Sequence, residues 1–165
     1  MKLGIVALLF GFMVSHPVFA SEPTVRVKPT QTQGPRTVEK QTETAVIRDY
    51  LESWKTLDAA LNGNRADQLD AYFVGTALTK LLGVVSDQTK AGIHTHYVEH
   101  SHDLQIIFYS PEGLSIQLAD DVEYEEQVFE GDKLLASKIV KRRYLAVLTP
   151  SEVRWRLRIL QPDNG

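Results

Sequence analysis

The second half of the chain alternates between apolar and polar residues in four successive segments. These segments lie within residues 94–161 and are separated by the turns Ser-Pro-Glu-Gly at 110–113, Glu-Gly-Asp-Lys at 130–133 and Thr-Pro-Ser-Glu at 149–152. A period of two is typical of β-strands, and such short turns join antiparallel neighbours, because parallel strands need a crossover of about a dozen residues. The pattern therefore predicts four consecutive antiparallel strands.

The residues before the first strand repeat their apolar positions with the spacing of helices. A first helix is predicted over residues 42–61, where apolar side chains recur every three or four positions and Asn-Gly supplies the stop. A short second helix is expected after Asn64, and a third from Thr76 to Gly92. Helices followed by consecutive strands predict an α+β fold, with about three helices on one face of a strongly curved four-stranded antiparallel sheet.

Two tryptophans and one basic stretch add detail to this prediction. Trp54 lies on the apolar stripe of the first helix and Trp155 on the apolar face of the last strand, so both are expected in the core. The third strand loses its alternation at residues 141–143, which predicts a bulge or bend where the sheet curls.

The N-terminal segment has the three regions of a secretory signal peptide. Lys2 precedes an apolar run over residues 3–14, and Val18-Phe19-Ala20 fits a cleavage site. The run is shorter than the ~20 apolar residues that cross a membrane, so no stable membrane insertion is expected after cleavage. We therefore predict a signal peptide at 1–20 and an exported protein, periplasmic or extracellular.

The remaining boundaries follow from composition. Residues 21–41 carry three prolines among threonine, glutamine and charged residues and have little to bury. This composition predicts a flexible tether. The folded domain is expected over residues 42–161, and residues 162–165 form a short tail.

Composition also excludes several classes of function. No cysteine occurs, which excludes disulfides, thiol catalysis and thiolate metal sites. Loss of Lys2 with the signal leaves one basic residue fewer than the 18 of the full chain, against 21 acidic residues. Nucleic-acid-binding domains are usually basic, so no nucleic-acid partner is expected. The motifs of the commonest nucleotide enzymes and hydrolases are absent, and no cofactor is expected.

A histidine cluster is the candidate metal site, and it consists of His94, His96, His100 and His102. In an unbroken strand all four share one face, and neighbours at i and i+2 lie about 6.6 Å apart, close enough to share Zn or Cu. We favour the alternative of a solvated, His-rich start of an edge strand, because Glu99 and Asp103 fall on the opposite face. The run also matches the H-x-x-E-H pattern of zinc proteases, but that chemistry needs a helix, and the residues here favour a strand.

Asp120 and Tyr124 are the candidate catalytic residues. Both fall on the apolar face of the second strand. A carboxylate aimed into a cavity is suited to act as a general base. The competing interpretation, which we favour, is that Asp120-Asp121 marks a bulge that returns Asp120 to solvent.

Charge is segregated along the strands. Residues 120–132 contain seven acids and no base, whereas residues 138–158 contain seven bases and one acid. Because the second and third strands pair, Glu123 and Glu125 are expected opposite lysine or arginine. The row of Arg154, Arg156 and Arg158 has fewer partners in the sequence. It is the candidate surface for an acidic protein or a second copy of the chain.

Taken together, these elements resemble the NTF2-like superfamily over residues 42–161. The resemblance rests on the helix with Trp54, the third helix and the strands that end in Val-Arg-Trp-Arg-Leu-Arg-Ile. Asp49-Tyr50-Leu51-Glu52-Ser53-Trp54, followed by Leu78, Tyr124-Glu125-Glu126 and Tyr144, is most similar to the non-catalytic domain of plastid and cyanobacterial division proteins. The resemblance implies a cone-shaped half-barrel with an inner pocket, often a homodimer through the sheet.

Three functions remain open. We favour an exported, non-catalytic domain that binds a partner protein or small apolar ligand through its concave sheet or pocket. The alternatives are a small lyase or isomerase with Asp120 as general base, and a metal-binding protein that uses the histidines. A buried aspartate within reach of Tyr or His favours the enzyme, whereas a cone filled by tryptophan and leucine favours the binder.

Overall fold

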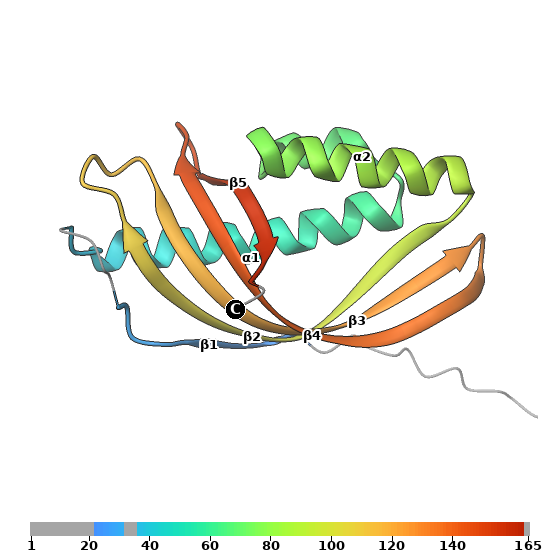
Figure 1. Cartoon of the computed structure of the whole chain (residues 1–165), viewed down its shortest axis with the longest axis horizontal. Helices are drawn as coiled ribbons and strands as arrows, with labels where there is room; N and C mark the ends of the chain where they lie inside the picture. The colour runs from blue at the N-terminus through green and yellow to red at the C-terminus, as the bar shows by residue number, and fades with distance from the viewer. Residues whose placement is uncertain (1–21, 32–35, 164–165) are drawn as a thin grey trace, which may run out of the picture.

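The computed structural model describes residues 22–31 and 36–163 (Figure 1). The elements are β1 (Thr24–Val27), α1 (Lys40–Asn62), the 3₁₀ helix η1 (Ala66–Ala71), α2 (Gly75–Ala91), β2 (His94–Tyr109), β3 (Ile116–Glu130), β4 (Lys133–Pro150) and β5 (Trp155–Pro162). The predicted signal peptide lies outside the described residues. Within them, no helix is long and apolar enough to cross a membrane.

The described strands form one sheet in the order β1-β2-β3-β4-β5. The four predicted strands are antiparallel neighbours, as their short turns require. The sheet nevertheless has five strands, not four, because Thr24–Val27 runs parallel to β2 as β1. These four residues fall in the segment that we expected to be a tether, so that part of the segment belongs to the sheet.

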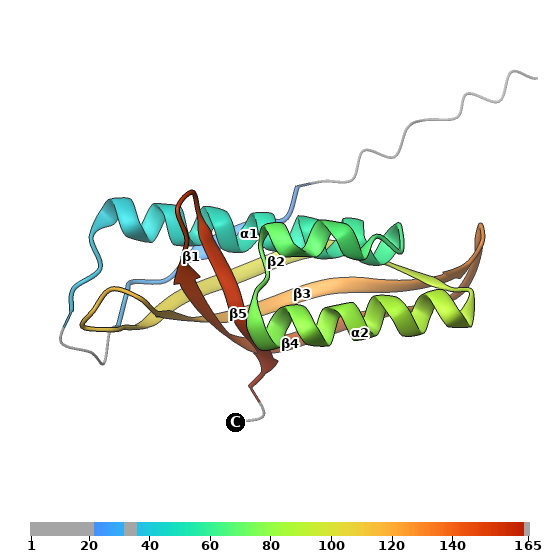
Figure 2. The same ribbon diagram turned by 90° about the horizontal axis from the view of Figure 1, so that it is seen from above.

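The helices cover the concave side of the sheet (Figure 1). Seen from above, α1 and α2 run beside each other along the long direction of the sheet (Figure 2). The apolar stripe of α1 is buried as its spacing predicts, from Val46 to Leu61. The short helix expected after Asn64 is η1, and α2 ends at Gly92, whose φ of 69° is left-handed. This backbone conformation favours glycine and stops the helix.

The sheet has its irregularities at other places than the sequence predicts. β4 pairs with β3 without a register shift over residues 136–148, so the bulge expected at 141–143 is absent. β2 instead has one shift between Glu99 and Ser101 and another between Ile106 and Phe108. The first shift makes His100 an extra residue and reverses the facing of the side chains that follow it.

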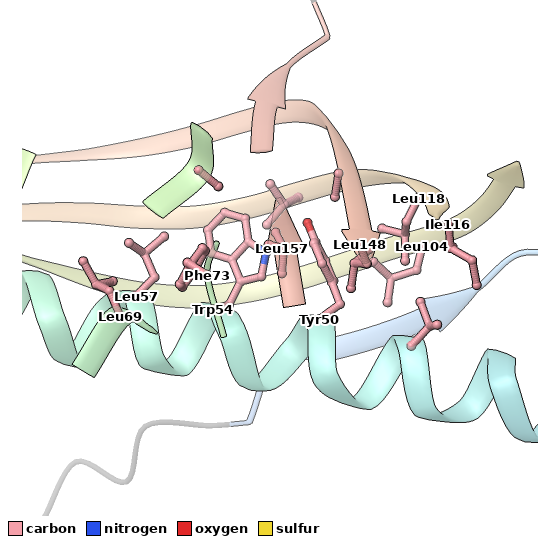
Figure 3. Close-up of a cluster of buried hydrophobic side chains, with 14 of the residues drawn as sticks. Tyr50, Trp54, Leu57, Leu69, Phe73, Leu104, Ile116, Leu118, Leu148 and Leu157 are labelled. Atoms are coloured by element: carbon pink, nitrogen blue, oxygen red, sulfur yellow. The ribbon is translucent and has the colours of Figure 1, made fainter. Parts of the chain in front are cut away.

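The core lies between α1 and the concave face of the sheet (Figure 3). Trp54 is buried as predicted and points from α1 toward the strands. Trp155 is only partly buried, contrary to prediction, and lies at the rim of the core against the ring of Tyr109. The apolar face of the last strand is centred on Leu157, while Val153 precedes the strand and is exposed.

Candidate functional site: a buried carboxylate and an edge groove

Asp120 lies on the concave face of β3 and is completely buried. Its Oδ2 accepts a hydrogen bond from the Tyr50 hydroxyl of α1 (2.8 Å) and lies 2.7 Å from Nδ1 of His102 on β2. Burial, followed by the charge of Asp120, raises the pKa of Tyr50 well above its ordinary value, so this phenol remains a neutral donor. Our expectation that a bulge returns Asp120 to solvent is wrong, because β3 pairs in register on both sides there.

His102 links Asp120 to a second carboxylate. Its Nε2 lies 3.0 Å from Glu99 Oε2, so each ring nitrogen faces a carboxylate oxygen, and both nitrogens donate only in the imidazolium. Burial opposes this charge, but the hydrogen bonds and charges of Asp120 and Glu99 outweigh it and raise the pKa of His102 to about 9. The bulge at His100 creates this pair, because an unbroken strand would place Glu99 and His102 on opposite faces.

Trp54 fills the interior of the cone in front of these groups. Its ring centroid lies 5.3 Å from that of His102 and 5.6 Å from that of Tyr124. Tyr124 points inward, but its hydroxyl lies 3.3 Å from the hydroxyl of Tyr144 and has no contact with Asp120 among the hydrogen bonds of the described chain. Burial, followed by the hydrogen bond with Tyr144, raises the pKa of Tyr124 above its ordinary value.

Asp120 is buried beside Tyr50 and His102, as a general base could be, but its access to a substrate differs from that of a general base. Oδ2 is occupied by two donors, whereas Oδ1 accepts no hydrogen bond from the described residues. Asp120 does not line any of four well-formed cavities in the described part of the chain. The carboxylate therefore has hydrogen-bond partners but no described cavity that leads a substrate to it.

The other three histidines have different partners. His94 stacks on Phe129 with 5.2 Å between ring centroids, and His96 Nδ1 lies 2.9 Å from Asp58 Oδ1. His100 is exposed at the bulge. The shared face was expected for an unbroken strand. The bulge at His100 breaks the alternation, so His102 faces the opposite side of the sheet from His94 and His96. In the part of the chain that the structure describes, no three histidine or carboxylate side chains are grouped to hold a metal ion.

The arginine row on β5 contacts the protein itself at two of its three positions. Arg156 donates hydrogen bonds to the backbone carbonyl of Asp70 in η1 and to that of Phe73 just after it, the latter at 2.9 Å. The guanidinium of Arg154 lies 4.6 Å from the centroid of the Tyr72 ring, a cation–π distance. Arg158 is exposed. The row therefore holds the turn between the helices rather than presenting three free cations.

A groove of about 480 Å³ lies between α1 and β1. Its apolar lining comes from Val25 and Val27 of β1 and from Ile47 and Leu51 of α1. The sequence did not predict this groove, because Thr24–Val27 lies in the segment that we expected to be a tether. The signal for the strand was present, since Thr24–Val27 alternates polar and apolar residues between two prolines.

Comparisons with known proteins establish the fold. No family model matches the sequence, and no curated protein is significantly similar to it. The intermembrane space region of the chloroplast protein ARC6 superposes with a TM-score of 0.60 at 12% identity, covering 77% of this chain and 98% of that chain.

Two further solved structures match at lower scores. ActVI-ORFA from Streptomyces coelicolor has a TM-score of 0.50 at 15% identity, covering 74% of this chain and 98% of that one. A putative scytalone dehydratase from Novosphingobium aromaticivorans has a TM-score of 0.50 at 13% identity, covering 76% and 89%. All three have NTF2-like folds, which confirms the NTF2-like fold of this chain.

Proposed function

We propose that this protein is a non-catalytic binding domain that takes a partner protein at the groove between α1 and β1. The observation that carries the proposal is the filled cone, in which Trp54 lies against His102 in front of Asp120. Exposed apolar surface that forms a groove marks sites of interaction with proteins or ligands. The groove exposes the side chains of Val25 and Val27, whereas Asp120 lines none of the four cavities described above.

The lyase or isomerase alternative is supported by the Tyr50–Asp120–His102 chain, which is the arrangement expected of an enzyme. The proton positions favour a structural role instead. Two donors already engage Asp120 Oδ2, and His102 between two carboxylates holds its proton as imidazolium, so it has no free lone pair to accept another. Buried charges persist when they are paired, and here one imidazolium lies between two carboxylates, while Asp120 Oδ1 lacks a partner among the described residues.

The fold by itself is neutral between these functions. One structural neighbour is named a dehydratase and another is a region of the chloroplast protein ARC6. Function resides in sites rather than in folds, so the proposal rests on the groove and the filled cone.

We also propose that the domain acts outside the cytoplasm. The support is the sequence of residues 1–20, which has the charged, apolar and small-residue regions of a signal peptide. An exported chain without cysteine relies on its core and buried ion pairs for stability, because disulfides are excluded.

A photo-crosslinking experiment tests binding at the groove. A photoreactive phenylalanine replaces Leu51 in the groove or, as control, Val153 in the exposed turn between β4 and β5. The mature chain is irradiated in the soluble exported fraction of its source cells. We expect a discrete protein adduct, identified by mass spectrometry, from position 51 and none from position 153. No adduct at position 51 would contradict the proposal.

A second arm tests the enzyme alternative directly. Wild type and Asp120→Asn are incubated with a metabolite extract of the same cells, and substrate loss is followed by mass spectrometry. We expect no difference between the two proteins. A metabolite consumed by wild type and spared by a folded Asp120→Asn protein would establish catalysis and overturn the proposal.

A further inference from the structure

β1 forms a free edge of the sheet. It pairs with β2 on one side, and all four of its residues are exposed. In a parallel pair, alternate residues of a strand turn their backbone groups toward the neighbour. Lys28 N donates to Leu104 O (2.8 Å), so the backbone groups of Val25 and Val27 point away from β2. Within the described chain no strand pairs with this side of β1.

The side chains beside this edge form an apolar floor. Val25 and Val27 are 39% and 45% exposed and face Ile47 and Leu51 of α1 across the groove. A free edge next to such a groove is the geometry that domains use to bind extended peptides. Backbone pairing then provides affinity, and pockets for alternate side chains provide specificity.

The groove continues along the same edge beyond β1. A second cavity of about 230 Å³ is lined by residues 96–99 of β2 and shares Glu22, Pro23, Lys55 and Glu99 with the first. The register of β1 begins at Ser101, so the earlier part of β2 has no β1 residue beside it. The two cavities therefore form one path along the edge, longer than β1 itself.

The shared end of the path is acidic. Lys55 pairs with Glu52 at 3.0 Å, and Glu22 and Glu99 line the same end. The hydrogen bond and charge of Glu52, together with the charges of Glu22 and Glu99, raise the pKa of Lys55. Lys55 is paired with Glu52 and His102 with Glu99, so Glu22 is the carboxylate at this end that no ion pair of the described residues neutralises. Its negative charge favours a cation on an incoming chain.

We propose that an extended segment of a partner protein adds to the free edge of β1 as an outer strand. Its alternate apolar side chains enter the groove between β1 and α1, and a lysine or arginine lies near Glu22 at the acidic end. This proposal rests on the binding function proposed above and gives it an occupant of stated chemistry.

The probe is a phage-displayed library of short linear peptides, selected on the wild-type mature chain. We expect enriched peptides with alternating apolar residues and a basic residue. The double variant Val25→Pro/Val27→Pro removes two outward N–H groups, and proline is tolerated on an edge where the N–H faces outward. It should weaken peptide binding about tenfold or more, because two backbone hydrogen bonds are lost. Val153→Pro, in an exposed turn, should leave binding unchanged.

A second variant keeps the test decisive if the prolines disturb the fold. Val25→Thr/Val27→Thr retains the backbone groups and removes part of the apolar floor, and it should also weaken binding. Hydrogen exchange gives an independent result. The amides of Val25 and Val27 should exchange rapidly in the free protein and slowly in the complex, because only the complex pairs them.

Three results would overturn the strand-addition proposal. In the first, the selection enriches no peptide. In the second, the enriched peptides bind the proline and threonine variants as tightly as the wild type. In the third, the wild type is a dimer and the proline variant is a monomer. The last would assign the edge to a second copy of the chain. Each leaves the binding function intact if the photo-adduct at position 51 still forms, so the two failures are distinguishable.

Discussion

His102 is an ionisable side chain with no exposed surface, placed between the carboxylates of Asp120 and Glu99. A buried charge is costly unless it is paired and hydrogen-bonded, and both ring nitrogens meet that requirement here. Removal of one partner would leave a buried charge uncompensated, so the three residues act as a unit.

This network predicts a specific dependence of stability on pH. The pKa of His102 is about 9 in the folded protein against 6.5 ordinarily, so the folded state binds this proton more tightly. Its stabilisation is complete below pH 6.5 and is lost as the pH rises through about 9. Urea unfolding should show a loss on the order of 3 kcal/mol between these limits. His102→Gln should abolish this loss, and the exposed His100→Gln should retain it. Equal wild-type stability at both limits would contradict the charged network.

The arginines of β5 provide a second test at this scale. Arg156→Ala removes donors to the backbone carbonyls of Asp70 and Phe73, at the end of η1 and just after it, and should cost about 1–3 kcal/mol in the free energy of unfolding. Arg158→Ala, two residues away and exposed, should change it by less than about 0.5 kcal/mol. The measurement is urea unfolding of both variants. Equal losses would mean that Arg156 does not hold this turn.

Among the helices, α2 has a glycine in its interior, Gly83, and is followed directly by another, Gly92. Both have open space around the position of a Cβ, so packing does not distinguish them. Gly83 lies within the helix, whereas Gly92 has a left-handed φ of 69°. The two positions therefore isolate the effect of backbone conformation.

Opposite effects are expected from the same substitution at these positions. Gly83→Ala should stabilise the protein by about 0.5–1 kcal/mol, because alanine has less backbone freedom to lose in a helix. Gly92→Ala should destabilise it by about 1–2 kcal/mol, because a Cβ disfavours the left-handed conformation. Thermal melting of the two variants checks the signs, and a stabilising Gly92→Ala would refute the cap.

The charge pairs between β3 and β4 were predicted in part. Glu123 was expected opposite a basic residue and pairs with Lys141 at 3.0 Å. Glu125 instead accepts hydrogen bonds from Ser137 and Gln127. Hairpin connectivity fixed which strands meet, but the exact partner depends on register, which a short turn constrains only to within a residue or two.

For the whole molecule, we predict that the signal peptide is removed and that the domain is exported. Cleavage after Ala20 should yield a mature chain that begins at Ser21, because the apolar run is too short to anchor the protein and small residues flank the site. Intact-mass measurement of protein from the exported fraction checks this start. Full-length chain recovered from membranes would contradict it.

The helices and hairpins were predictable from patterns among neighbouring residues of the sequence. Helical spacing predicted the α1 stripe with Trp54, and period-two alternation with short turns predicted four antiparallel strands. These signals are strong because a helix or hairpin satisfies its hydrogen bonds and apolar face among nearby residues. The same patterns supported the NTF2-like fold, which the structural neighbours confirm.

The candidate site is formed by contacts between segments that are distant in the sequence. The extra residue at His100 brings Glu99 and His102 to one face, and Tyr50 reaches Asp120 from 70 positions away in the chain. β1 joins the sheet through β2, not through a neighbour in sequence. Bulges, burial and edge pairing depend on which distant segments contact each other. The alternation of residues along one strand does not predict those contacts.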